Sequence, residues 1–277
     1  MTPARLAVLG NPIAHSRSPE IHQAFARQAS IDLTYERLLV PEGQFAAVAQ
    51  SFVDGSQHGA PGLGFNVTLP CKHEAWQWVD RATDAANFAQ AVNTVSRDEN
   101  GKFVGDNTDG AGLVADLTKN LGWQVRDARV LIIGAGGAVS GVLGPLVAAR
   151  PSVIHLFNRT QEKARQLANR FDHTTVAAVD STQLEPGYDL VINGTSAGLA
   201  GQQVSLPDRI VASHSDCYDM VYGPAETVFN AWCRERGAAR QADGLGMLVE
   251  QASLAFSIWF HREVATQSVA QDLRATL

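Results

Sequence analysis

The sequence predicts an α/β protein that joins a doubly wound domain with a parallel sheet to a second, smaller α/β domain. A short apolar run at residues 130–133 leads directly into a glycine cluster and then into a helix-like segment. Short apolar runs and helix-like segments go on alternating in this region, and a separate alternation precedes residue 112. The length of 277 residues suits two domains.

The doubly wound domain is expected over residues 112–243. Further strands are predicted at residues 153–157, 176–179, 190–192 and 217–220. The helix after the glycine cluster has apolar residues at helical spacing from Val142 to Val147, and the next helix is expected to run to about Phe171. Strands that alternate with helices in this way form a parallel sheet covered on both faces.

The smaller domain is expected over residues 1–111. Its predicted elements are strands at residues 6–9, 33–40 and 62–67, a helix from Pro19 and a helix at residues 44–51. Residues 244–277 are helical in pattern, with a stripe formed by Met247, Gln251, Leu254 and Ile258. Because two helices cannot bury themselves, we expect this segment to pack back on the first domain.

Composition narrows the classes of function. The formal net charge of −6 argues against nucleic acid or an anionic membrane as a partner. The chain has no apolar run of about 18 residues and no secretory leader pattern. Its three cysteines, at positions 71, 217 and 233, form neither a metal-binding spacing nor an even disulfide set. We therefore expect a cytoplasmic protein without a metal, whose partner is a small molecule, and a homodimer stays an open alternative to a monomer.

The glycine cluster predicts a site for an anionic ligand. Gly134 and Gly136 match the first two positions of the dinucleotide fingerprint, but the third position is Val139 and the small residue moves to Ala138. Glycine lets the backbone approach a pyrophosphate, and the following helix directs its free N–H groups toward it. A glycine-rich turn without a ligand is the alternative.

The second strand of this domain indicates which dinucleotide binds. NAD-binding units usually carry an acidic residue there, whereas this strand ends in Asn158, Arg159 and Thr160, with Lys163 one turn further on. Arg159 and Lys163 can neutralise a 2′-phosphate, and Thr160 can donate a hydrogen bond to it. Thr160 as a simple helix N-cap is the alternative. Together with the glycines, the pattern favours NADP.

Four polar clusters lie outside the nucleotide unit, and each has an ordinary structural interpretation. Ser18 and Pro19 can begin a helix as N-cap and first residue, although two serine hydroxyls at a helix start can also bind a carboxylate. The other clusters contain caps, Asx turns and a lysine that solvent alone can satisfy. They are residues 16–20, 66–72, 91–95 and 105–110.

These clusters, in their order along the chain, resemble the motifs of the shikimate dehydrogenase family. The matching strings are S-R-S-P, N-V-T-L-P-C-K, A-V-N-T-V, G-D-N-T-D-G, G-A-G-G-A, N-R-T, N-G-T-S-A-G, Y-D-M-V-Y and D-G-L-G-M-L-V-E-Q-A. They span residues 10–252, nearly the whole chain. The resemblance implies a Rossmann-type NADP-binding domain and a substrate domain completed by the C-terminal helices. It also implies NADPH-dependent, reversible reduction of 3-dehydroshikimate to shikimate, a step of aromatic amino-acid biosynthesis toward chorismate.

The resemblance also implies roles for individual residues. Lys72 and Asp109 would be the catalytic pair. The substrate would contact Ser16, Ser18 and Tyr222 through its carboxylate, and Thr68, Asn93 and Gln251 through its hydroxyls. NADP would contact Gly134, Gly136, Gly137, Ala138, Asn158, Arg159, Thr160, Lys163, Thr195, Ser196, Met220 and Gly244.

Elementary chemistry agrees with the catalytic roles. Hydride transfer to a ketone leaves an alkoxide, which needs a proton donor within hydrogen-bond reach, and an ammonium also stabilises the negative charge. Gln251 is otherwise unexpected on an apolar stripe, where an unpaired amide is costly, and a substrate hydroxyl would pair it.

The chain departs from the family pattern at three places. Val139-Ser140 stands where many members have Ser-Arg, Gly194 follows Asn193 where alanine is usual, and Cys71 replaces a common phenylalanine. The loss of a cationic phosphate contact at position 140 bears on affinity rather than on chemistry.

Three rival interpretations differ in what they require. A quinate/shikimate dehydrogenase of the same superfamily, or one that uses NAD, would need small changes around the carboxylate site or near Arg159. A non-catalytic NADP-sensing regulatory protein would lack Lys72 or Asp109, and both are present. A folate-type dehydrogenase of similar build does not suit the S-R-S-P string or the segment around Gln251.

Overall fold

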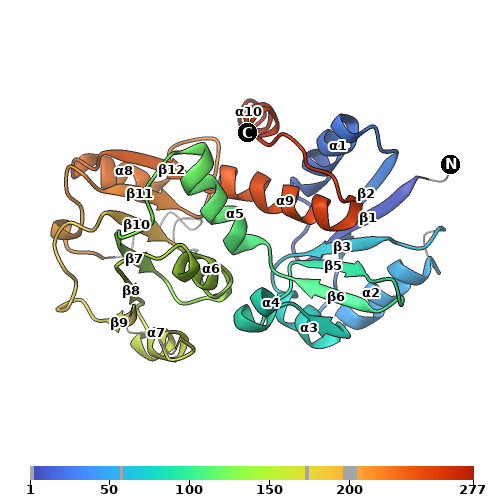
Figure 1. Cartoon of the computed structure of the whole chain (residues 1–277), viewed down its shortest axis with the longest axis horizontal. Coiled ribbons are helices and arrows are strands. Elements are labelled where there is room, and N and C mark those ends of the chain that lie inside the picture. The colour runs from blue at the N-terminus through green and yellow to red at the C-terminus, as the bar shows by residue number, and fades with distance from the viewer. Residues whose placement is uncertain (1–2, 57–58, 172–174, 196–204) are drawn as a thin grey trace. The chain divides into compact units, whose positions relative to one another are not determined.

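The computed structural model describes residues 3–56, 59–171, 175–195 and 205–277, and the chain divides into two compact units. Unit 1 comprises Met1–Gly112 and Val249–Val269, and unit 2 comprises Leu113–Leu248 and Ala270–Leu277. Each unit contains one six-stranded sheet with helices packed against it (Figure 1), which confirms the predicted α/β class. No helix among the described residues is long and apolar enough to span a membrane.

The sheet of unit 1 has the strand order β2-β1-β3-β5-β6-β4. Strands β1, β2 and β3 are parallel to one another, whereas β5 is antiparallel to both β3 and β6. Residues that follow β3 and β6 therefore lie at the same edge of the sheet as residues that precede β5. The strands are β1 (Ala4–Gly10), β2 (Leu33–Leu39), β3 (Gly64–Val67), β4 (Arg81–Ala82), β5 (Thr94–Arg97) and β6 (Phe103–Asp106).

Helices of unit 1 cover this sheet with apolar side chains. They are α1 (Ser18–Ala29), α2 (Phe45–Asp54), α3 (Lys72–Trp78) and α4 (Asp84–Ala89), together with most of α9 (Leu245–Phe260), while α5 (Asp109–Ala115) begins here. Trp259 of α9 packs in one buried cluster with Leu6, Val8 and Tyr35, and its Nε1 donates to the carbonyl of Val95 at 2.9 Å. Of the C-terminal segment that was expected to pack on the first domain, Val249–Val269 belongs to unit 1, whereas the residues up to Leu248 and Ala270–Leu277 belong to unit 2.

The predicted stripe of α9 is not its most buried face. Its most buried face contains Val249, Ala252, Phe256 and Trp259, while the four residues of the predicted stripe are only half-buried. The helix is apolar on several sides, so the sequence period could not identify the face that packs.

The sheet of unit 2 has the order β12-β11-β10-β7-β8-β9, and all its strand pairs are parallel. This is the Rossmann order, with the first strand, β7, at the centre, where the chain direction across the sheet reverses and ligands bind. The buried runs that were predicted from the sequence form this sheet. Its strands are β7 (Arg129–Ile133), β8 (Val153–Phe157), β9 (Val176–Val179), β10 (Leu190–Asn193), β11 (Asp216–Asp219) and β12 (Arg240–Asp243).

Two details of unit 2 differ from expectation. The sixth strand, β12, was not predicted because Arg240–Asp243 is mostly polar and lies at the sheet edge. The helix expected to reach Phe171 ends at Ala168. The helices are η1 (Asp116–Asn120, a π-helix), α6 (Gly137–Ala148), α7 (Gln161–Ala168), the short η3 (Asp208–Ile210), α8 (Val228–Glu235) and α10 (Gln267–Arg274).

Candidate active site

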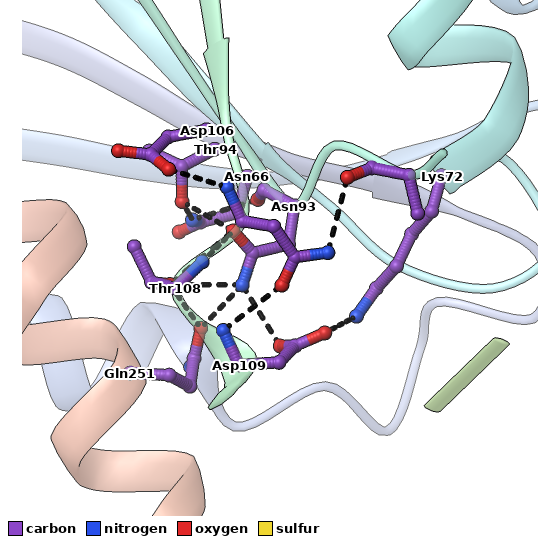
Figure 2. A network of polar contacts seen from close by, with 10 residues as sticks. Asn66, Lys72, Asn93, Thr94, Asp106, Thr108, Asp109 and Gln251 are labelled. Carbon is purple, nitrogen blue, oxygen red and sulfur yellow. Dashed lines mark hydrogen bonds and ion pairs between the residues drawn. The ribbon is translucent and has the colours of Figure 1, made fainter. Parts of the chain in front are cut away.

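Lys72 and Asp109 form an ion pair in unit 1. The Lys72 Nζ donates to Asp109 Oδ2 at 2.5 Å (Figure 2), and the two side chains are only 22% and 11% exposed. Lys72 is the first residue of α3, and its carbonyl accepts from the Val92 N–H at 2.9 Å. The structure therefore brings together two residues that lie 37 positions apart.

The turn before Asp109 explains how its carboxylate is aimed. Asp106 Oδ1 accepts from Thr83 Oγ1 and from the Asn107 N–H, both at 2.7 Å. Asn107 donates to the Ala91 carbonyl at 3.0 Å, and its Oδ1 accepts from the Asp109 N–H at 3.1 Å. Asp106 and Asn107 thus shape the turn, as their ordinary interpretation predicts, and Asp109 alone of these three directs its side chain to Lys72.

Asn93 connects this pair to the rest of the network in Figure 2. The residue is 2% exposed, and its Nδ2 donates to Asp109 Oδ1 and Thr108 Oγ1, each at 2.8 Å. Its Oδ1 accepts from the Thr108 N–H and from Thr94 Oγ1, each at 2.9 Å. Each oxygen of Asp109 therefore has its own donor, Asn93 for one and Lys72 for the other.

Gln251 reaches the same network from α9. Its Oε1 accepts longer hydrogen bonds from Asn93 Nδ2 at 3.3 Å and Thr108 Oγ1 at 3.4 Å. The expectation that its amide would lack partners without a substrate is thus wrong for the oxygen. The side chain is half-buried, and its backbone lies so close to Gly112 that a Cβ there would come within 2.7 Å of the Gln251 nitrogen.

The predicted carboxylate site lies at the start of α1. Ser16 Oγ donates to Ser18 Oγ at 3.2 Å and accepts from the Ser18 N–H at 3.3 Å. The expected N-cap role of Ser18 is wrong, because the helix begins at Ser18 itself and Arg17 occupies the N-cap position. Glu20 of the first turn is paired with Arg37 through two bonds of 2.9 Å.

Several residues of this network were given no role in the site by the sequence. Asn66, Thr94 and Thr108 lie inside three of the quoted motifs, which was a usable signal, whereas Tyr35 looks like an ordinary strand residue. Thr68, which was predicted to bind a hydroxyl, follows β3 and is half-buried, with its N–H bonded to the Leu9 carbonyl at 2.9 Å.

In unit 2 the glycine cluster leaves room at the start of α6. A Cβ at Gly136 or Gly137 would meet no atom within 4 Å, and Ala138 is exposed. Gly134 has φ +115°, and a Cβ there would lie 3.1 Å from the backbone of Gly194. The free N–H groups of this helix start are thus accessible to an anion.

The end of β8 presents basic and polar side chains. Arg159, Thr160 and Lys163 are exposed, and none of them has an ion pair or a side-chain hydrogen bond with the described residues. Asn158 Nδ2 donates to the Thr160 carbonyl at 2.8 Å. Thr160 is the N-cap residue of α7, but its side chain makes no capping bond there.

The predicted nicotinamide residues follow β10 and β11. Thr195 donates to Asn193 Oδ1 through both its N–H (3.1 Å) and its hydroxyl (2.8 Å), and Asn193 Nδ2 donates to Asp219 Oδ1 at 3.0 Å. Burial raises the pKa of the Asp219 carboxyl, against hydrogen bonds from Thr227, Val221 and Asn193. A Cβ at Gly244 would lie 2.3 Å from the carbonyl oxygen of Met220, so only glycine fits there.

Two of the predicted site residues remain, Ser196 and Tyr222. Ser196 lies outside the described residues. Tyr222 is half-buried and follows β11 in unit 2, and its role toward a carboxylate stays a prediction. Among the described residues, no group of three histidines, cysteines or carboxylates could hold a metal ion.

Comparison with known proteins places these features in one family. Family models match residues 8–95 (shikimate dehydrogenase substrate binding domain), 116–203 (shikimate / quinate 5-dehydrogenase) and 244–274 (shikimate 5′-dehydrogenase C-terminal domain). The chain belongs to the shikimate dehydrogenase family. A shikimate dehydrogenase (NADP⁺) from Alcanivorax borkumensis is 48% identical over 96% of this chain and 95% of its own length.

Solved structures agree with this assignment. An Ael1 enzyme from Pseudomonas putida is 38% identical, with a TM-score of 0.91 over 98% of both chains. Shikimate 5-dehydrogenase from Thermus thermophilus, solved with NADP(H) and shikimate, is 30% identical, with a TM-score of 0.87 over 99% of this chain and 100% of that one. The shikimate dehydrogenase family resemblance and the Rossmann-type fold expected from the motifs are confirmed.

Proposed function

We propose that this member of the shikimate dehydrogenase family catalyses the reversible reduction of 3-dehydroshikimate to shikimate with NADPH. The observation that carries the proposal is the Lys72–Asp109 ion pair, in which Asn93 supports the second carboxylate oxygen. A regulatory protein without chemistry would have no need of this arrangement.

The residues of unit 1 supply the proton and its positioning. NADPH, when bound, supplies the hydride that adds to the ketone carbon. The C=O double bond then becomes a C–O single bond, and the Lys72 ammonium gives its proton to that oxygen, leaving a hydroxyl and a neutral amine. Before the transfer, the ammonium also stabilises the negative charge developing on this oxygen. Asp109 holds the ammonium in place, and the reverse reaction returns the proton to Lys72.

The two serines at the start of α1 support a site for the substrate carboxylate. Ser16 and Ser18 present two hydroxyls at the start of α1, where a helix N-terminus favours a negative group. Glu20 would repel a carboxylate, but Arg37 pairs with it and offsets that charge. Thr68, Asn93 and Gln251 would contact the ring hydroxyls, as the family resemblance implies.

Unit 2 fits NADP by the chemistry of its groups. The open approach at Gly136 and Gly137 suits a pyrophosphate. The exposed Arg159, Thr160 and Lys163 suit the 2′-phosphate, because none is engaged by a described carboxylate. Thr195, Met220 and Gly244 would surround the nicotinamide.

The test is the oxidation of NADPH by 3-dehydroshikimate, followed by absorbance. The reverse direction compares shikimate with quinate and NADP with NAD at one ionic strength. We expect activity with 3-dehydroshikimate and NADPH, and activity confined to quinate or to NAD would refute the assignment. The three cysteines are free and buried, which fits a reducing compartment, and we propose a cytoplasmic enzyme.

A further inference from the structure

A buried chain of hydrogen bonds leads from β2 to the Lys72–Asp109 pair. It begins at Tyr35, which is 5% exposed and whose hydroxyl donates to Asn66 Oδ1 at 2.6 Å. His22 stacks on the Tyr35 ring, with centroids 4.6 Å apart and planes 5° from parallel. The phenol is therefore held in one orientation, with its hydroxyl directed at Asn66.

A backbone carbonyl fixes which groups donate and which accept in the first hydrogen bonds of this chain. Asn66 Nδ2 donates to the Asn93 carbonyl at 3.1 Å and to Thr94 Oγ1 at 3.0 Å (Figure 2). Because a carbonyl can only accept, the NH₂ end of Asn66 must face it, and the amide oxygen is left facing Tyr35. Burial raises the pKa of Tyr35 well above its ordinary value, against a smaller hydrogen-bond effect of Ser18, so the phenol keeps its proton for this bond.

The remaining hydrogen bonds, through Thr94 and Asn93, keep the same donor-to-acceptor order as far as Asp109. Thr94 Oγ1 accepts from Asn66, so its own hydrogen is directed to Asn93 Oδ1 at 2.9 Å. The same oxygen accepts from the Thr108 N–H. With its oxygen facing these donors, Asn93 presents its NH₂ group to Asp109.

We propose that Tyr35 is a positioning residue for the reaction, which acts through Asn66, Thr94 and Asn93 to hold the Asp109 carboxylate against Lys72. The proposal rests on the proposed function, because it gives Lys72 and Asp109 their roles. Without the phenolic hydroxyl, the buried Asn66 Oδ1 loses its 2.6 Å hydrogen bond from Tyr35, and the amide is free to shift. The carboxylate then loses a defined place, and the proton donor loses its alignment with the substrate.

The first test is Tyr35→Phe, which removes one oxygen and keeps the ring that stacks on His22. We expect kcat for 3-dehydroshikimate reduction to fall about tenfold, the equivalent of one hydrogen bond, with an unchanged KM for NADPH. The matched control is Tyr188→Phe, which removes an equally buried hydroxyl bonded to His155 Nδ1 at 2.7 Å in unit 2. We expect Tyr188→Phe to lower the melting temperature about as much as Tyr35→Phe does, but to keep kcat within twofold of wild type.

A second pair of variants tests the middle of the chain without touching Tyr35. Thr94→Val has nearly the same shape but cannot donate to Asn93, whereas Thr94→Ser keeps the hydroxyl. We expect Thr94→Val to lower kcat about tenfold and Thr94→Ser to keep it near wild type, and this pair decides the matter if Tyr35→Phe does not fold. An unchanged kcat in folded Tyr35→Phe, an equal fall in Tyr188→Phe, or equal values for both Thr94 variants would overturn the proposal. Wild-type protein that does not reduce 3-dehydroshikimate would overturn the proposed function instead.

Discussion

Replacing Lys72 by alanine tests the proposed proton donor directly. We expect Lys72→Ala to lower kcat by about 10²-fold or more, the range for losing a general acid. The KM for 3-dehydroshikimate should change less, because Ser16 and Ser18 are untouched, and the KM for NADPH should stay the same. The loss falls on kcat because the ammonium is needed where the alkoxide forms, not where the carboxylate binds.

The structure also limits how far this substitution can destabilise the fold. The lost bond joins two charged groups at 2.5 Å that are mostly buried, which corresponds to about 1.5–3 kcal/mol. Asp109 keeps the hydrogen bond from Asn93 at 2.8 Å, so its carboxylate is not left without a donor. With a domain stability of about 5–15 kcal/mol, the variant should remain folded at assay temperature.

The assay is steady-state NADPH oxidation, with a thermal unfolding curve for each variant. Lys102→Ala is the matched control, because Lys102 is 64% exposed and pairs with Asp80 at 3.2 Å on the surface of the same unit. It should change neither kcat nor the melting temperature appreciably. A folded Lys72→Ala enzyme with near-normal kcat would remove Lys72 from the mechanism, and an equal loss in Lys102→Ala would show that the effect is not specific.

Three further predictions concern binding and pH. Gln251→Ala should weaken shikimate affinity in calorimetry and leave NADP affinity and melting temperature little changed, since the bonds it loses are long; a large drop in melting temperature at unchanged shikimate affinity would contradict this. Arg159→Ala should lower kcat/KM for NADP at least about tenfold and leave kcat/KM for NAD little changed. Adding Asn158→Asp should reverse the preference, so that the enzyme uses NAD better than NADP. Equal losses for both cofactors would count against a role of Arg159 in binding the 2′-phosphate. Burial lowers the pKa of His22 from 6.5 to about 3, with a smaller opposing effect of Asn66, so on acidification the unfolded chain binds a proton that the folded chain does not. The contribution of His22 to the free energy of unfolding is therefore complete above about pH 6.5 and is lost toward pH 3, by about 1.4 kcal/mol per pH unit. In urea unfolding, the stability of His22→Leu should therefore depend less on pH than that of wild type. Parallel stability curves for the two proteins would be evidence against this account.

The sequence predicted those parts of the fold whose pattern is unambiguous. Buried parallel strands are mostly apolar runs, and such runs marked β7 to β10 in unit 2, whereas β11 has only Cys217 and Tyr218 between two aspartates. The edge strand β12 was missed because Arg240–Asp243 has one apolar residue, Ala242, and takes its place through backbone pairing with β11. In α9 the period could not identify the packed face, because apolar residues occur on several sides of the helix.

The candidate site shows a similar limit. Lys72, Asn93, Asp109 and Gln251 were assigned through the family motifs, and the structure brings all four into one network. Spacing alone could not have joined them, since they come from four separate segments of unit 1. Tyr35 stayed unrecognised because its role depends on the strand order, which places β2 and β3 on either side of β1 and brings its hydroxyl to Asn66.

Two of the departures from the family pattern near the cofactor residues, Val139 and Gly194, are better understood as one packing change than as separate losses. Val139 is fully buried, and a Cβ at position 194 would lie 2.4 Å from its Cγ2 and 3.2 Å from Met220 Sδ. A β-branched valine in a helix has few rotamers with which to avoid such a contact. Valine at 139 and alanine at 194 therefore exclude each other, and Gly194 accommodates the larger side chain. Because this exchange takes place beneath the start of α6, it leaves the open approach at Gly136 and Gly137 intact, as a retained dinucleotide site requires.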